Sequence, residues 1–117
     1  MTLPGLFSCQ RKPAVERHDT MTSGEATVAI DECFLPFMRE EIAVFQGINE
    51  DATIHPLYVS EREAFDLLFK DSVRLIVAGR NMTEAEKERL KDMNLLPRST
   101  KIAEDAIAFI IHASNKD

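Results

Sequence analysis

The sequence predicts an α/β fold, with an open, mainly parallel sheet and flanking helices in three layers. Short runs rich in β-branched residues alternate with helix-like segments of about 10 to 15 residues, which is typical of a parallel sheet with right-handed crossovers. Two capping boxes, at Ser60 and at Thr83, mark the starts of helices between these runs. The predicted order is βαβαβαββ.

The first strand and helix occupy residues 25–46. Residues 25–30 end in a nearly continuous apolar run, which suits a strand covered on both faces. After a turn over residues 31–34, the helix is expected to run to Gln46 and to end at Gly47. Its apolar residues recur at spacings of four and three: Phe34, Met38, Ile42 and Phe45.

Residues 52–59 form the second predicted strand, which Pro56 places at an edge or at a bulge because proline cannot donate to a ladder. Ser60, with Glu63 three residues later, caps the second helix. Residues 73–78 follow as a third strand, predicted to be central, and a charged helix runs from Thr83 to about Met93.

Two short strands are predicted at residues 100–103 and 106–112. The second is strongly apolar and needs cover on both faces, yet three helices give modest cover for five strands. We therefore expect the chain to be the front portion of a longer protein.

Residues 1–24 lack periodicity and carry Pro, Gly, Ser and Thr, which predicts a disordered tether before a folded part over residues 25–117. Residues 6–9, Leu-Phe-Ser-Cys, resemble the lipobox of bacterial lipoproteins, in which Cys9 would carry the lipid. The alternative is an ordinary frayed terminus.

The formal charge of -6 and the absence of a basic stripe argue against nucleic-acid binding. The sequence has two cysteines and no Cys-x-x-Cys or Cys/His cluster, so we expect no metal centre, and we expect no cofactor. Asp31 and Glu32, at the end of the first strand, could hold a divalent metal as in phosphoacceptor receiver domains. Those domains need an acid after the third strand, where this chain has Ala78-Gly79-Arg80.

Three turns are expected at one sheet edge, where open α/β sheets bind ligands. Cys33, near a helix N-terminus, could have a lowered pKa and act as a nucleophile, or be a buried, inert thiol. Ser60 begins a helix whose N–H groups could hold an anion. Arg80 could pair with an anionic ligand or with Asp31 and Glu32. Tyr58, three residues before Glu61, is expected to form a wall of this site rather than to contact the ligand.

The folded part resembles the N-terminal portion of phosphate-type substrate-binding proteins of bacterial ABC importers. Three segments carry the resemblance: ATVAIDECFLPFMREEIAVFQ at 26–46, ATIHPLYVSEREAFDLLFKDSVRLIVAGRNMTEAEKERLK at 52–91, and STKIAEDAIAFIIHASN at 99–115. In that family a strand leads into a helix carrying Pro and Phe. A tyrosine-bearing strand precedes the second helix, and an Ala-x-Asp-Ala-x-Ala-type segment, here residues 103–108, enters the second half.

The resemblance implies one incomplete lobe of a periplasmic-binding-protein clamshell that is not an enzyme. It also implies phosphate or another small anion as ligand, a membrane ABC permease as partner, and a periplasmic or cell-envelope location with a lipid anchor at Cys9. The ligand contacts carried over by position are Glu32, Cys33, Phe34, Ser60 and Arg80. The family places Ser, Thr or Gly-rich turns where this chain has Asp31, Glu32 and Glu61.

Two alternatives stay open beside this interpretation. One is a self-contained cytosolic α/β signalling or interaction module in which Cys9 is unmodified. The other is a small thiol enzyme that uses Cys33, which requires a nearby base.

Overall fold

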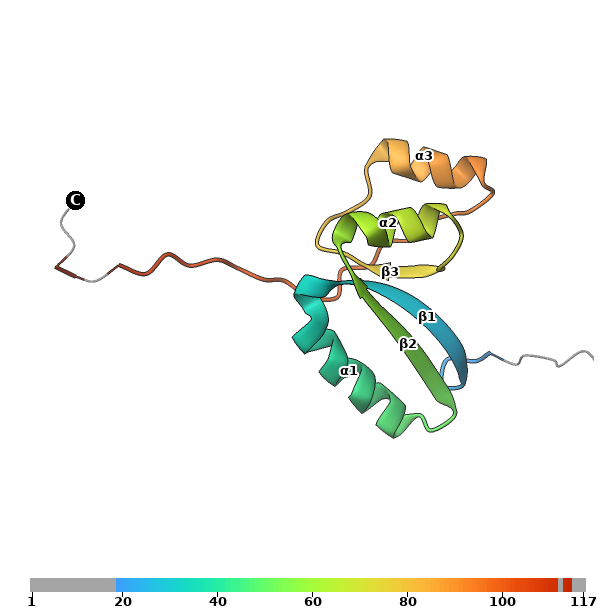
Figure 1. Ribbon diagram of the computed structural model, residues 1–117, viewed down its shortest axis with the longest axis horizontal. Helices are drawn as coiled ribbons and strands as arrows, with labels where there is room; N and C mark the ends of the chain where they lie inside the picture. The colour runs from blue at the N-terminus through green and yellow to red at the C-terminus, as the bar shows by residue number, and fades with distance from the viewer. Residues whose placement is uncertain (1–18, 112, 115–117) are drawn as a thin grey trace, which may run out of the picture. The chain divides into compact units, whose positions relative to one another are not determined.

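The computed structural model describes residues 19–111 and 113–114, in two compact units divided after Gly79. The first unit contains six elements in chain order: β1 (Gly24–Asp31), the 3₁₀ turn η1 (Glu32–Phe34), α1 (Leu35–Ile48), β2 (Ala52–Val59), α2 (Glu61–Phe69) and β3 (Leu75–Val77). Figure 1 shows these elements along the chain. Cys9 and the rest of the lipobox lie outside the described residues.

The sheet of the first unit has the order β2-β1-β3, and β1 pairs in parallel with both neighbours. The predicted α/β fold with a parallel sheet is therefore confirmed. The prediction that the third strand is central was wrong: β1 is central, and β3 is a short edge strand whose Leu75 is exposed. Pro56 lies in the other edge strand, β2, as predicted, where its missing N–H costs the sheet nothing on its outer side.

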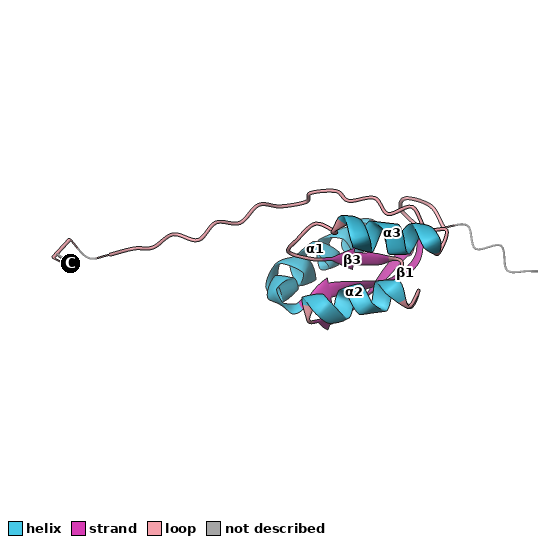
Figure 2. Ribbon diagram, turned by 90° about the horizontal axis from the view of Figure 1, so that it is seen from above, coloured by secondary structure: helices cyan, strands magenta, loops and turns pink. Residues whose placement is uncertain are grey.

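Helices α1 and α2 cover opposite faces of this sheet, because successive side chains of a strand alternate between faces. Val28 and Ile30 of β1 form a buried cluster with Ile42 of α1. Partly buried residues pack around this cluster: Phe34, Met38, Ile54, Tyr58 and Val77. Ala29 points the other way and is fully buried; α2, which contacts β1 and β3, runs alongside β3 in Figure 2. Cover on both faces explains the continuous apolar run of β1.

Helix α1 continues through the predicted stop at Gly47 and ends at Ile48. A Cβ at Gly47 would meet nothing within 4 Å, so no close approach demands a glycine there. The helix end is satisfied by Asn49 instead, whose backbone N–H and side-chain Nδ2 both donate to the Phe45 carbonyl at 2.9 Å. The asparagine cap therefore sets this boundary.

The second unit contains α3 (Glu84–Asp92), which begins at the predicted cap Thr83. Asn94, with φ of 58°, ends the helix, and Leu95 N–H donates to the Leu90 carbonyl at 2.9 Å. The two strands predicted at 100–103 and 106–112 are not strands where the structure describes them: residues 100–111 are irregular and exposed, and residue 112 lies outside the described part. Among the described residues, no helix is both long and apolar enough to cross a membrane.

Candidate functional site

The turns after β1, β2 and β3 meet at the carboxyl edge of the sheet. The register pairs Asp31 with Val59 and Ile30 with Val77, so the three strands end at nearly the same level. Glu61 Oε1, on the first turn of α2, accepts the Gly79 N–H at 3.1 Å. A Cβ built at Gly79 would lie 3.5 Å from Glu61 Oε1 and 3.7 Å from Phe34 Cζ. Gly79 therefore lies close to a residue from each of the other two turns.

Asp31 ends β1 and caps the turn that follows. It is a buried residue, and its Oδ1 accepts the Cys33 N–H at 3.1 Å. A carboxylate in this position satisfies a backbone donor at the start of the turn. The described residues contain no group of three or more His, Cys, Asp or Glu that could hold a metal ion. The acid at the end of β1 is thus explained by capping.

The Cys33 thiol differs from both sequence-based expectations. It is exposed rather than buried. Its pKa is raised rather than lowered, first by its hydrogen bond with the Asp31 carboxylate and then by the negative charges of Asp31 and Glu32. A raised pKa keeps the thiol protonated at neutral pH, whereas a nucleophile must be a thiolate. This geometry argues against the thiol-enzyme alternative.

Ser60 caps α2 as predicted. Its φ and ψ of -63° and 153° are extended, and its Oγ accepts the Glu63 N–H at 3.3 Å. Glu32 and Ser60 are exposed, and Phe34 is half-buried beside the core cluster. Tyr58 also packs against that cluster, and its hydroxyl is buried without a hydrogen-bond partner among the described residues. Tyr58 therefore packs as part of the core near the end of β2.

Arg80 begins the second unit and is braced by Glu86. Its two terminal nitrogens donate to Glu86 Oε2 and Oε1, each at 2.8 Å, which is a bidentate ion pair. Nη1 also donates to the Asn81 carbonyl at 3.1 Å. Sequence reasoning expected a ligand or Asp31 and Glu32 as partners of Arg80, and it treated Glu86 only as a helix cap.

Glu86 serves two purposes at once. Its Oε2 accepts the Thr83 N–H at 2.9 Å while Thr83 Oγ1 accepts the Glu86 N–H at 3.3 Å, which completes the predicted capping box. The hydrogen bonds from Arg80 and from the Thr83 backbone lower the pKa of Glu86 to about 2, against a smaller opposing effect of burial. The carboxylate is consequently ionised at neutral pH, and it holds the Arg80 guanidinium at the start of α3.

Sequence reasoning missed the roles of Glu61, Gly79 and Glu86 in these contacts. Glu61 was noticed only as an acid out of keeping with an anion site, and its bond to Gly79 joins positions 18 residues apart. Only the pairing register brings such positions together. The pairing of Glu86 with Arg80 could have been predicted from the sequence, because Arg80 lies six residues before Glu86 across a turn.

No protein-family model matches this sequence, and no curated protein matches it. Two solved structures are similar in fold. The first, from Planctomyces limnophilus, is described as a possible phosphate binding protein; it has a TM-score of 0.56 and 18% identity, over 62% of this chain and 25% of that protein. The second is the phosphate-binding protein of a phosphate ABC transporter from Streptococcus pneumoniae, with a TM-score of 0.50 and 15% identity, over 57% of this chain and 26% of that one.

These similarities establish the fold of the chain. The fold they share with this chain is a small parallel sheet with helices on its faces. The chain spans about a quarter of the length of each neighbour.

Proposed function

We propose that the chain is part of an extracytoplasmic solute-binding protein of an ABC importer and belongs to the phosphate-type family. The observation that carries the proposal is the meeting of three turns at the carboxyl edge, marked by the hydrogen bond from Gly79 to Glu61 and by the nearby ring of Phe34. Open parallel sheets bind ligands outside this edge. The same fold occurs in two proteins described as phosphate-binding or possibly so.

The proposed ligand is phosphate or a related small anion, held by five residues: Glu32, Cys33, Phe34, Ser60 and Arg80. Ser60 offers a hydroxyl at the start of α2, where helix N–H groups favour negative charge. Arg80 supplies the cation, in a fork that matches an oxyanion. In the proposed role it exchanges part of its bond with Glu86 for the ligand.

The acids at the edge restrict which anion can bind. Asp31, Glu32 and Glu61 all lie at or just beyond the ends of the strands, and a hydrogen bond to Asp31, followed by the charges of Asp31 and Glu32, raises the pKa of Cys33. A fully deprotonated oxyanion is repelled by such carboxylates, whereas one that keeps a proton can donate a hydrogen bond to them. We therefore favour a protonated oxyanion, such as monohydrogen phosphate.

The proposal also gives the domain organisation, the cellular location and the partner. Residues 25–117 form the N-terminal part of one lobe, and residues 1–24 tether it to the membrane surface through a lipid on Cys9. The location is the periplasm or cell envelope, and the partner is a membrane permease. The protein performs no reaction: it captures the anion and releases it to the permease.

The proposal is tested by titrating phosphate into the chain by calorimetry. We expect weak binding, with a dissociation constant on the order of 1 mM for a half-formed cleft. Arg80→Ala should weaken it by about ten-fold or more, because a charge-assisted hydrogen bond is lost. Arg39→Ala is the matched control, since Arg39 is an exposed arginine whose ion pair with Glu40 is 3.8 Å long.

Equal phosphate affinity in the Arg80 variant would remove the arginine from the site. Absence of any phosphate binding by the unmodified chain at tens of millimolar would overturn the anion-receptor proposal and favour the interaction-module alternative. Circular dichroism of each variant, recorded beside the titration, separates lost binding from lost folding.

A further inference from the structure

We propose that the amino-terminal edge of the sheet docks a basic protein segment that inserts one large apolar side chain. This surface lies at the other end of the strands from the three turns. The inference rests on the first unit alone and does not depend on phosphate binding.

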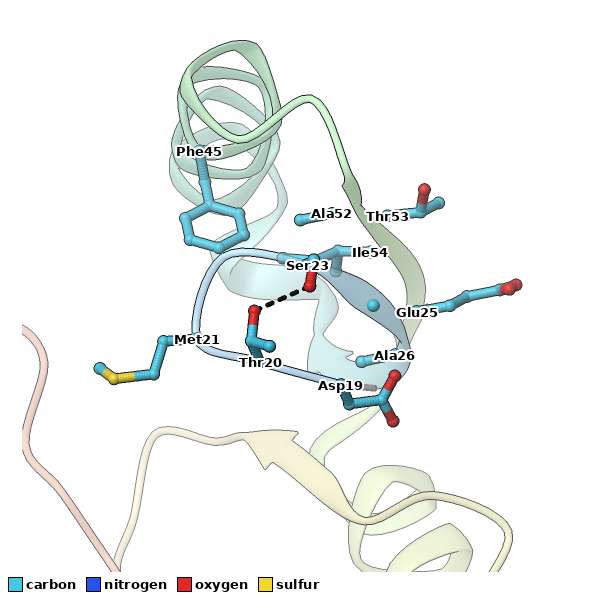
Figure 3. A pocket seen from close by; sticks show the side chains of 11 residues that line it. Asp19, Thr20, Met21, Ser23, Glu25, Ala26, Phe45, Ala52, Thr53 and Ile54 are labelled. Carbon is cyan, nitrogen blue, oxygen red and sulfur yellow. Dashed lines mark hydrogen bonds between the residues drawn. The ribbon is translucent and has the colours of Figure 1, made fainter. Parts of the chain in front are cut away.

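A pocket of about 240 Å³ opens at this edge (Figure 3). Its apolar lining comes from four places in the chain: Met21 in the loop before β1, Ala26 in β1, Phe45 in α1, and Ala52 and Ile54 in β2. The ring of Phe45 points toward the loop that carries Thr20 and Ser23, whose hydroxyl oxygens lie 2.7 Å apart. Pockets for whole small ligands start at roughly 300 Å³, so this one suits a single side chain.

Exposed apolar residues also occur in the loop before β1 and on the last two turns of α1, the helix that carries Phe45. Met21 is 94% exposed and Ile48 is 76% exposed. Val44, 59% exposed, and Phe45 occupy the preceding turn of α1. Large apolar side chains gathered around a pocket mark an interaction site rather than ordinary surface.

The rim of the pocket is acidic. Asp19 and Glu25 line it, with Glu25 Oε1 at 2.6 Å from His55 Nε2, and Glu50 and Asp51 occupy the turn that leads into β2. The Gly24 N–H donates to the Asp51 carbonyl at 3.0 Å, which fixes that turn beside the start of β1. No lysine or arginine is among the lining residues, all of which lie in the described part of the chain.

Charge selects one occupant. A second copy of this chain, with its formal charge of -6, would bring acidic rims together, and an anionic lipid surface would be repelled in the same way. A segment with two or more lysines or arginines around one Phe or Leu complements both the rim and the pocket. Apolar anchors in pockets supply affinity, while surrounding charges set specificity and the association rate.

The test uses the chain labelled with ¹⁵N and three capped peptides: Lys-Lys-Phe-Lys-Lys, Lys-Lys-Ala-Lys-Lys and Glu-Glu-Phe-Glu-Glu. We expect saturable shifts at Gly24, Phe45 and Ile54 with the first peptide. The alanine peptide should bind about ten-fold more weakly, the loss expected when a large apolar anchor is removed. The acidic peptide should not shift these amides, and added salt should weaken the basic peptides.

Two variants test the pocket and the rim separately. Ala26→Met places a side chain in the pocket and should reduce affinity for the phenylalanine peptide to that of the alanine peptide. Glu25→Gln combined with Asp51→Asn should weaken both basic peptides and flatten their salt dependence. Phe37→Ser, at the far end of α1, is the control and should bind as the unmodified chain does.

Equal shifts from the acidic and basic peptides would overturn the proposed preference for a basic segment. The absence of shifts with every peptide would overturn the docking surface itself. Shifts that appear on concentrating the chain alone would assign the surface to a second copy instead. None of the three variants alters Glu61, Gly79 or Arg80. Phosphate titration of the same samples therefore tests the proposed anion site independently of the docking surface.

Discussion

The central strand β1 and the segment Ala106–Ile111 are alike in sequence but opposite in structure. Both contain a short apolar run that includes alanine and isoleucine: Val28-Ala29-Ile30 in β1, and Ala-Ile-Ala-Phe-Ile-Ile over residues 106–111. Ala29 and Ile30 of β1 are fully buried, whereas Phe109 and Ile110 are 93% and 94% exposed. The first pairs with strands on both sides, and the second belongs to no strand in the described part of the chain.

The difference teaches that apolar character favours a strand but does not create one. Strand propensity measures how well side chains fit a half-buried, pleated surface supplied by neighbours. β1 has such neighbours in β2 and β3, and helices on both faces. The segment 106–111 shows the same residues without a ladder, and its exposed apolar side chains are of the kind that mark interaction sites.

The largest expected effect comes from the same substitution in both regions. Ile30→Ala should lower the free energy of unfolding by about 2–4 kcal/mol, because it leaves a cavity in place of a fully buried side chain. Ile110→Ala should change it by less than about 0.5 kcal/mol. Urea denaturation followed by circular dichroism measures both.

A loss above 1 kcal/mol in Ile110→Ala would break the comparison, because it would show that residues 106–111 are packed in solution. Equal losses in the two variants would do so most directly. The denaturant slope of each variant should match that of the unmodified chain, since neither substitution is expected to change the surface exposed on unfolding.

A smaller effect tests why α3, in the same unit as residues 106–111, is ordered. Glu86→Gln keeps the side chain's shape but removes the charge that holds Arg80 and the Thr83 N–H. We expect it to lower stability at pH 7 by about 1 kcal/mol, the usual scale for a partly exposed, charge-assisted pair. Order in α3 then rests on these local bonds, whereas, among the described residues, the Ala106 N–H donates only to the side chain of the preceding Asp105.

The stabilisation supplied by the Glu86 carboxylate should depend on pH. The pKa of Glu86 is lowered from its ordinary 4.5 to about 2 in the folded chain. Its stabilisation is therefore complete above about pH 4.5 and is lost as the pH falls toward 2. The unmodified chain should lose stability more steeply than Glu86→Gln across this window, and parallel pH curves would contradict the role given to the ion pair.

The smallest expected effect concerns the polar atom inside the core beside β1. Tyr58→Phe removes a buried hydroxyl that has no hydrogen-bond partner among the described residues. Because no bond is lost, thermal unfolding should show unchanged or slightly raised stability, by up to about 1 kcal/mol. A clear loss would mean that the hydroxyl is hydrogen-bonded in solution, and Phe34→Leu nearby serves as a packing control.

Local signals predicted the fold where local chemistry decides it. The bounds of β2 were predicted exactly, and Ser60 and Thr83 both cap helices as expected. The errors lie where neighbours decide. The end of α1 depends on the Asn49 side chain rather than on Gly47, and the edge position of β3 depends on strand order, which no short pattern encodes.

The candidate site divides in the same way. That the three turns share an edge was predictable, because parallel strands end together. The hydrogen bond from Gly79 to Glu61 and the raised pKa of Cys33 were not, since both depend on the positions of side chains across the edge. The ligand-contact roles of Glu32, Cys33, Phe34, Ser60 and Arg80 stay predictions.

The strand order also bears on how the chain assembles. Ile30 and Tyr58, partners across β1 and β2, are 28 residues apart, whereas Val28 and Leu75, across β1 and β3, are 47 apart. The longer closure costs about 0.5 kcal/mol more chain entropy. It is rewarded by a ladder of only three residue pairs, against eight for β2. The parallel β1-α1-β2 unit is thus the natural folding nucleus, and Gly79 reaches Glu61 only when β3 docks.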